Sequence, residues 1–130
     1  MEPGESLPDL AVTPDRYLTY RYAGASGDFN PIHIDVDFAK QVGLPSNILH
    51  GLYTMAQVAR ANVNAAGGDP RSLKRLSVQF RGMGFPEQEI TITGKVKEER
   101  EDRVIVETEA AQSGKRIIRN AEAELTQPPQ

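Results

Sequence analysis

The chain has 130 residues, of which 38% are hydrophobic and 25% are charged, and its net charge is −3. This size and composition predict one globular domain over residues 1–130, with loose ends at about 1–6 and 127–130. The absence of cysteine excludes disulfides, thiolate metal ligands and a cysteine nucleophile, and it is compatible with a cytoplasmic protein.

Charge and hydropathy argue against two classes of partner. The Lys and Arg residues are scattered and do not alternate with aromatic residues, so we expect no nucleic-acid binding. No stretch approaches the roughly 20 apolar residues that cross a bilayer, so we expect no membrane partner. The acidic start of the chain does not resemble a secretory signal peptide.

The N-terminal half predicts short elements separated by turns. Thr13 before Pro14 is typical of a helix start, and Asp35 is suited to cap a second short helix that ends at Gly43. The expected elements are an edge strand over residues 7–12, a helix over 14–25 and a helix over 36–42.

A longer helix is predicted from Gly51 to Ala66, before the pair Gly67-Gly68. Small and apolar residues recur there at helical spacing, which predicts a buried stripe. The stripe consists of Leu52, Met55, Ala56, Ala59, Val63 and Ala66.

From Leu73 onward, apolar and polar residues alternate in several runs. Alternation with turn residues between the runs is typical of antiparallel strands. The segments 99–102 and 112–115 are suited to be hairpin connections. Helices followed by meandering strands predict an α+β domain.

Ser26-Gly27-Asp28-Phe29-Asn30-Pro31-Ile32-His33 lies between the first two predicted helices. Gly, Asn and Pro break regular structure, so we predict a turn or loop with Asp28 and His33 at its ends. A carboxylate and an imidazole held this way can straddle one water and act as a general acid and base. The alternative is that Asp28 only stabilises an Asx-type turn and His33 is a half-buried ring.

The stretch from Tyr22 to His33 resembles the signature of the MaoC-like, (R)-specific enoyl-thioester hydratases and dehydratases, and the resemblance extends over about residues 17–66. It implies a hot-dog fold, in which a curled antiparallel sheet wraps around the long helix. It also implies a hydro-lyase that reversibly converts trans-2-enoyl-CoA or -ACP to the (R)-3-hydroxyacyl thioester. The thioester is the substrate, and no cofactor is expected.

The resemblance also implies roles for single residues. Asp28 and His33 are expected to activate water, and the Gly51 amide is expected to bind the thioester oxygen; the first turn of a helix presents unpaired N–H groups suited to that role. Asn30 is expected to hold the turn or to contact substrate, and Ser26 is a further substrate-binding candidate. For His50 we expect substrate contact, helix capping or packing.

Two other features have a functional and a structural interpretation. Phe80, Met83 and Phe85 flank a broken strand and either line an acyl tunnel or pack in the core. His33, Asp35 and Asp37 would share one face of an extended segment, as metal ligands do. Because Asp35 already serves as a helix cap, we predict no metal site.

Two alternatives to a self-sufficient hydratase stay open. One is a hot-dog acyl-CoA thioesterase, and the other is a subunit that is active only with a related chain. The resemblance implies a homodimer or a heterodimer with a related hot-dog subunit.

Overall fold

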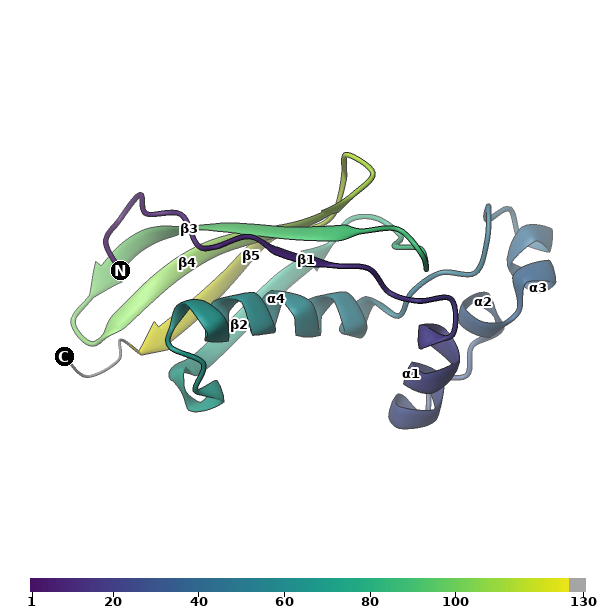
Figure 1. Ribbon diagram of the computed structural model, residues 1–130, viewed down its shortest axis with the longest axis horizontal. Helices are drawn as coiled ribbons and strands as arrows, with labels where there is room; N and C mark the ends of the chain where they lie inside the picture. The colour runs from purple at the N-terminus through teal and green to yellow at the C-terminus, as the bar shows by residue number, and fades with distance from the viewer. Residues whose placement is uncertain (127–130) are drawn as a thin grey trace.

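One antiparallel sheet with a long helix lying across it forms the body of the molecule in the computed structural model, which describes residues 1–126 (Figure 1). The strands follow the spatial order β1-β3-β4-β5-β2, and each neighbouring pair is antiparallel. The long helix, α4 (Gly51–Ala65), contacts four of them. The strands are β1 (Leu10–Val12), β2 (Leu73–Phe80), β3 (Ile90–Arg100), β4 (Arg103–Gln112) and β5 (Lys115–Thr126). The predicted α+β architecture is confirmed.

Three short helices lie together at one end of the molecule, beyond the N-terminal end of α4 (Figure 1). They are α1 (Leu18–Ser26), α2 (Pro31–Ile34) and α3 (Val36–Gln41). The Asp35 side chain accepts a hydrogen bond from the Phe38 amide at 3.0 Å, so the predicted cap of α3 is confirmed. This helical end carries the candidate site.

The start of α1 differs from the prediction. The helix begins at Leu18 rather than at Pro14, and Thr13 does not cap it. The Asp15 carboxylate accepts from the Tyr17 amide at 2.8 Å, and the Asp15 carbonyl accepts from the Leu18 amide at 3.1 Å. A turn stabilised by Asp15 therefore replaces the first predicted helical turn.

The N-terminal end is bound to the sheet, so the prediction of a loose end over residues 1–6 is wrong. The Gly4 amide donates to the Val96 carbonyl at 2.8 Å, and the Val96 amide donates to the Glu5 carbonyl at 2.9 Å. Leu7 is buried in the core. The other predicted loose end, 127–130, lies outside the described residues.

Both predicted hairpins are present. Glu101 (φ 46°) lies between β3 and β4, and Ser113 (φ 51°) with Gly114 (φ 76°) lies between β4 and β5. Positive φ at tight hairpin turns matches the twist of the strands they join. Each turn therefore places consecutive strands side by side.

The buried face of α4 matches the predicted stripe only in part: Met55 packs against the core, and Ala66, just after the helix, is buried. Leu52 is 60% exposed, and Ala56 is also exposed. The fully buried residues within α4 are Thr54, Val58, Ala61 and Asn62. Asn62 is tolerated there because its amide donates to the Val58 carbonyl at 2.9 Å and to the Thr108 hydroxyl at 3.2 Å. The buried face therefore combines apolar residues with a polar residue that is bonded to β4.

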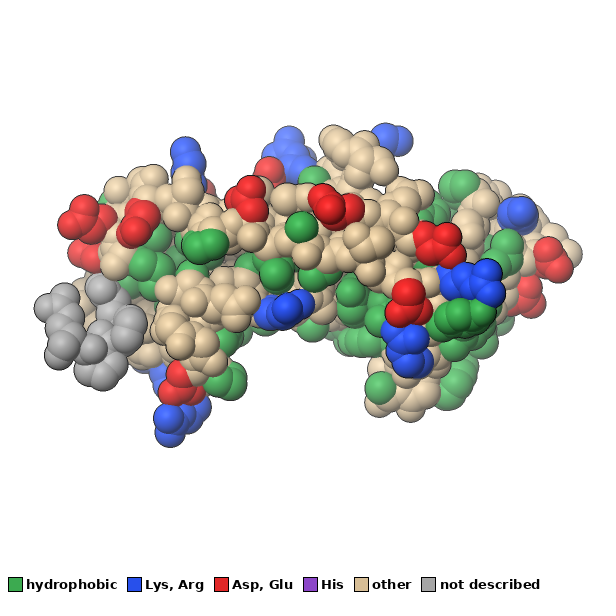
Figure 2. All heavy atoms as spheres, viewed as in Figure 1, with side chains coloured by type: hydrophobic (Ala, Val, Ile, Leu, Met, Phe, Trp, Pro, Cys, Tyr) green, Lys and Arg blue, Asp and Glu red, His purple; other side chains and the backbone are tan. Residues whose placement is uncertain are grey.

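Charges of both signs are distributed over the face shown in Figure 2, as the sequence predicted. Ion pairs across the sheet join Lys97 on β3 to Glu107 on β4 and to Glu122 on β5, and Arg116 on β5 to Glu109 on β4. Among residues 1–126, no helix has both the length and the apolar character needed to cross a bilayer.

Candidate active site

The turn before α2 is built by local side-chain to main-chain hydrogen bonds. The Ser26 hydroxyl accepts from the Asp28 amide, the Asp28 carboxylate accepts from the Asn30 amide, and the Asn30 side chain accepts from the Ile32 amide, each at 3.2 Å. Asn30 thereby caps α2, and Pro31 occupies its first position. His33 lies within this one-turn helix, so the prediction of a turn or loop is correct only for the first half of the segment.

Asp28 and His33 face each other. Asp28 Oδ2 lies 3.6 Å from His33 Nε2, with the Asp28 side chain 53% exposed and the His33 side chain 10% exposed. His33 Nδ1 lies 2.9 Å from the Ile48 carbonyl oxygen. Because a carbonyl only accepts, Nδ1 must carry a proton, and in the neutral ring Nε2 then presents its lone pair toward Asp28. The Asx-type turn at Asp28 is therefore present together with the acid–imidazole pair.

Asn47 supports the helix that carries His33. Its side-chain amide donates to the His33 carbonyl at 2.9 Å and to the Thr19 hydroxyl at 3.3 Å, and the residue is buried. These bonds tie the α3–α4 loop to α1 and α2. Sequence reasoning missed Asn47 because an Asn after Pro45-Ser46 is an ordinary loop residue unless its burial is known.

His50 is the residue before α4 and lies inside an aromatic group. Its ring stacks on the His33 ring with centroids 3.9 Å apart and planes inclined by 21°, and Tyr22 lies on it at 4.8 Å. Tyr53 contacts Tyr22 edge-on, and partial burial raises the pKa of Tyr53. The His50 side chain makes no capping hydrogen bond, so the capping interpretation is wrong.

A small cavity of about 170 Å³ opens beside His33, whereas Asp28 is not part of its wall. His33, Gly51, Phe80 and Met83 contribute to its wall. Gly51 is the first residue of α4, where N–H groups have no partner within the helix. The Phe80 ring lies so close that a Cβ on Gly51 would be 3.0 Å from it. The structure thus brings His33, Gly51 and two of the three predicted wall residues to one cavity.

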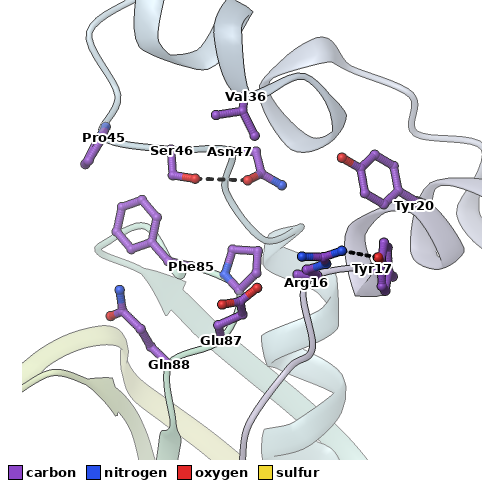
Figure 3. Close-up of a pocket in the computed structure, with 11 residues that line it drawn as sticks. Arg16, Tyr17, Tyr20, Val36, Pro45, Ser46, Asn47, Phe85, Glu87 and Gln88 are labelled. Atoms are coloured by element: carbon purple, nitrogen blue, oxygen red, sulfur yellow. Dashed lines mark hydrogen bonds between the residues drawn. The ribbon is translucent and has the colours of Figure 1, made fainter.

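Phe85 lies elsewhere. It lines a larger hollow of about 650 Å³. This hollow lies between the N-terminal end of α1, the loop at Pro45 and the β2–β3 connection (Figure 3). The Gln112 side chain holds this connection by accepting from the Phe85 amide and donating to the Phe85 carbonyl, both at 2.8 Å. The expectation that Phe85 shares a wall with Phe80 and Met83 is therefore wrong, because the bound main chain directs it to the other hollow.

Asp28, His33 and His50 also form the one cluster in the described part of the chain that has the composition of a metal site, with ligand atoms within 4.8 Å of one another. The ring geometry does not fit that role. Imidazole binds a metal along an in-plane nitrogen lone pair, at about 2.0–2.1 Å for zinc. In two nearly parallel rings 3.9 Å apart, the in-plane lone pairs do not converge on one point at that distance. The metal-ligand set considered from the sequence was His33, Asp35 and Asp37. In that set, the Asp35 carboxylate already accepts the hydrogen bond that caps α3.

Comparison with known sequences places this site in a family context. The profile of the family described as "MaoC like domain" matches residues 2–118. The chain is 38% identical over 111 residues to "Fatty acid synthase beta subunit hexB" of Dothistroma septosporum, covering 83% of this chain and 6% of the relative. It is 36% identical over 93 residues to "Enoyl-CoA hydratase ChsH3" of Mycobacterium tuberculosis, covering 68% and 32%. The chain thus covers a third or less of the length of each of these relatives.

Solved structures show the same architecture. A structure titled "MaoC-like dehydratase" superimposes with a TM-score of 0.93 at 31% identity, over 98% of this chain and 41% of that chain. The (R)-hydratase from A. caviae superimposes with a TM-score of 0.84 at 22% identity, over 98% of both chains. The chain adopts the hot-dog fold and belongs to the MaoC-like dehydratase family.

Proposed function

We propose that this protein hydrates trans-2-enoyl thioesters to (R)-3-hydroxyacyl thioesters, and dehydrates them in reverse, without a cofactor. The main support is the 3.6 Å separation of Asp28 Oδ2 and His33 Nε2, together with a cavity that His33 and Gly51 both line. A carboxylate and an unprotonated imidazole nitrogen are both acceptors. A water molecule, which donates two hydrogen bonds, is suited to bridge them.

In the hydration direction, the water oxygen bonds to C3 of the enoyl group while one water proton passes to the Asp28–His33 pair. The pair then delivers one proton to C2, so the two groups return to their starting protonation. The reverse sequence removes C2–H and releases water. Such paired proton transfer contributes about 10²–10⁴-fold to a rate.

Charge builds on the thioester oxygen as C3 is attacked. The Gly51 amide, at the positive end of the α4 dipole, is the proposed donor to that oxygen. Phe80 and Met83 would contact the acyl part, whereas Asn30 and Ser26 hold the turn that carries Asp28. Asn30 and Ser26 are therefore proposed to act through Asp28 rather than on substrate.

The relatives support the class of substrate. One is named "Enoyl-CoA hydratase 2, peroxisomal" of Arabidopsis thaliana, at 42% identity over 74 residues, or 56% of this chain and 23% of that relative. Others are fatty acid synthase subunits. Thioesters of CoA and of acyl carrier protein are both proposed substrates, and a panel of enoyl groups of different length and bulk on each carrier would rank them.

The deciding experiment is hydration of crotonyl-CoA by the purified chain and by Asp28→Asn. We expect the variant to lose at least about 100-fold in kcat. Asp37→Asn, an exposed acid nearby on α3, is the matched control and should keep parental activity. Equal rates for Asp28→Asn and the parent would contradict the proposal. Release of free thiol from acyl-CoA without hydration would instead indicate a thioesterase.

We also propose that the chain works as a homodimer or with a related hot-dog subunit. The outer side of β2 has no neighbouring strand within residues 1–126. Leu52, Phe80 and Met83 are large apolar residues near the site, exposed by 60%, 51% and 47%. A solved ChsH1–ChsH2 complex shares the fold. Light scattering on the purified chain would separate a dimer from a monomer that needs a partner.

A further inference from the structure

His50 has no role in the scheme above, although it lies in the middle of the site. The residue is 3% exposed, and its ring contacts those of both Tyr22 and His33. It occupies the N-cap position of α4 without forming a cap, at a place where Ser, Thr, Asp or Asn is usually preferred. A residue that breaks a local rule in this way points to a functional constraint.

One ring nitrogen of His50 binds the turn that carries Asp28. His50 Nε2 lies 3.0 Å from the Asp28 carbonyl oxygen, and because a carbonyl only accepts, Nε2 is the donor. Within residues 1–126, the other hydrogen bonds of residues 27–30 run only to residues 23–33. The bond from His50 is therefore the link that ties the Asp28 main chain to α4.

The other ring nitrogen has no partner. His50 Nδ1 is buried and makes no hydrogen bond in the described structure. In the neutral ring with a proton on Nε2, Nδ1 is an acceptor left unsatisfied. An unsatisfied buried acceptor costs free energy. A residue that served only for packing at this place would avoid this cost, as an apolar ring does. Compared with an apolar ring, the imidazole supplies the hydrogen bond to the Asp28 carbonyl and also stacks on His33.

We propose that His50 is a positioning residue that holds Asp28 and His33 at bridging distance. The Nε2–H bond fixes the Asp28 main chain, and the ring face limits rotation of the His33 ring. Without the bond, the exposed turn at 27–30 moves independently of α4, and the separation of the acid and the imidazole varies. Misplacement of reacting groups by about 1 Å costs on the order of 100-fold in rate.

The inference rests on the proposed hydratase activity, and two variants test it. His50→Phe keeps an aromatic ring against His33 and removes the donor, whereas His50→Gln keeps a donor near the Nε2 position and removes the ring. We expect His50→Phe to lose about 10- to 100-fold in kcat with KM changed less than about threefold, and His50→Gln to recover most of that loss. Asp37→Asn serves as the unaffected control.

A second measurement does not depend on activity. Amide hydrogen exchange at residues 28–30 should become faster in His50→Phe and stay near the parental rate in His50→Gln, while exchange in β3 and β4 is unchanged in both. Parental exchange and parental kcat in His50→Phe would overturn the inference. If the parent hydrates no enoyl thioester, the proposed function fails, and the exchange data alone decide the role of His50.

Discussion

The His33 Nδ1 atom lies 2.9 Å from the Ile48 carbonyl oxygen, and this contact determines which ring nitrogen presents a lone pair to Asp28. We predict that the neutral His33 ring carries its proton on Nδ1. Nitrogen-15 NMR of the imidazole groups distinguishes the two tautomers directly. A neutral His33 protonated on Nε2 would contradict the contact and would remove the acceptor on which the proposed water activation depends.

A second prediction concerns the space above Gly51. Gly51→Ala places a Cβ about 3.0 Å from the Phe80 ring, which is half exposed and can move, so we expect little loss of stability. The new methyl group lies beside the proposed donor to the thioester oxygen, and kcat should fall about 10- to 100-fold. Steady-state kinetics and thermal unfolding measure the two effects separately.

The double variant Gly51→Ala with Phe80→Ala is the control. It removes the contact between the methyl group and the ring, but leaves the methyl group beside the amide. Recovery of kcat in the double variant, relative to Phe80→Ala alone, would show that the loss came from the displaced ring and not from the amide.

A third prediction concerns Asn47. Asn47→Ala removes the donor to the buried His33 carbonyl and to Thr19, so unfolding free energy should fall by about 1–3 kcal/mol. Asn64→Ala, on the exposed face of α4, should change it by less than about 0.5 kcal/mol. Urea unfolding of both variants provides the comparison, and similar values for the two would contradict a supporting role for Asn47.

A fourth prediction concerns metal removal. Because in-plane lone pairs of the stacked His33 and His50 rings do not converge on one ion, we expect incubation with a chelator and subsequent dialysis to leave the hydration rate within about twofold of the untreated protein. A loss of activity that returns on adding back one particular divalent ion would contradict this expectation.

A fifth prediction follows from the ion pair at the start of α1. The hydrogen bond from Arg21, followed by that from the Tyr17 amide, lowers the pKa of Asp15 below its ordinary value. A lowered pKa in the folded state means that Asp15 stabilises the fold above its unfolded pKa, and that this stabilisation disappears as pH falls through the folded pKa. Asp15→Asn should therefore unfold with a weaker dependence on pH in the acid range, measured by thermal unfolding. The effect will be small because the pair is exposed to solvent.

Features that depend on neighbours in sequence were predicted best. Asp28 and His33 are five residues apart across residues that form a turn and a one-turn helix, so local geometry brings the two residues near each other. Gly51 could be placed at a helix start from the pattern that follows it. Alternation of apolar and polar residues identified β3, β4 and β5 because consecutive antiparallel strands need only short turns.

Features that depend on contacts distant in sequence were missed. The buried face of α4 includes Asn62, which bonds to Thr108, 46 residues later, and helical periodicity does not predict that bond. Phe85 is directed by Gln112, 27 residues later. The pairing of Gly4 and Glu5 with β3 likewise joins residues about 90 positions apart, so composition alone suggested a free end.

The segment 47–51 supplies most of the support for the acid–imidazole pair. Asn47 holds the His33 carbonyl, Ile48 fixes the His33 ring nitrogen, and His50 holds the Asp28 carbonyl. The site is thus an assembly of two short peptides, 28–33 and 47–51, and insertion of even one residue into the second would shift all of its contacts at once. Anyone grafting this site onto another scaffold would need to reproduce those two peptides, their mutual placement, and the cavity wall formed by Phe80 and Met83.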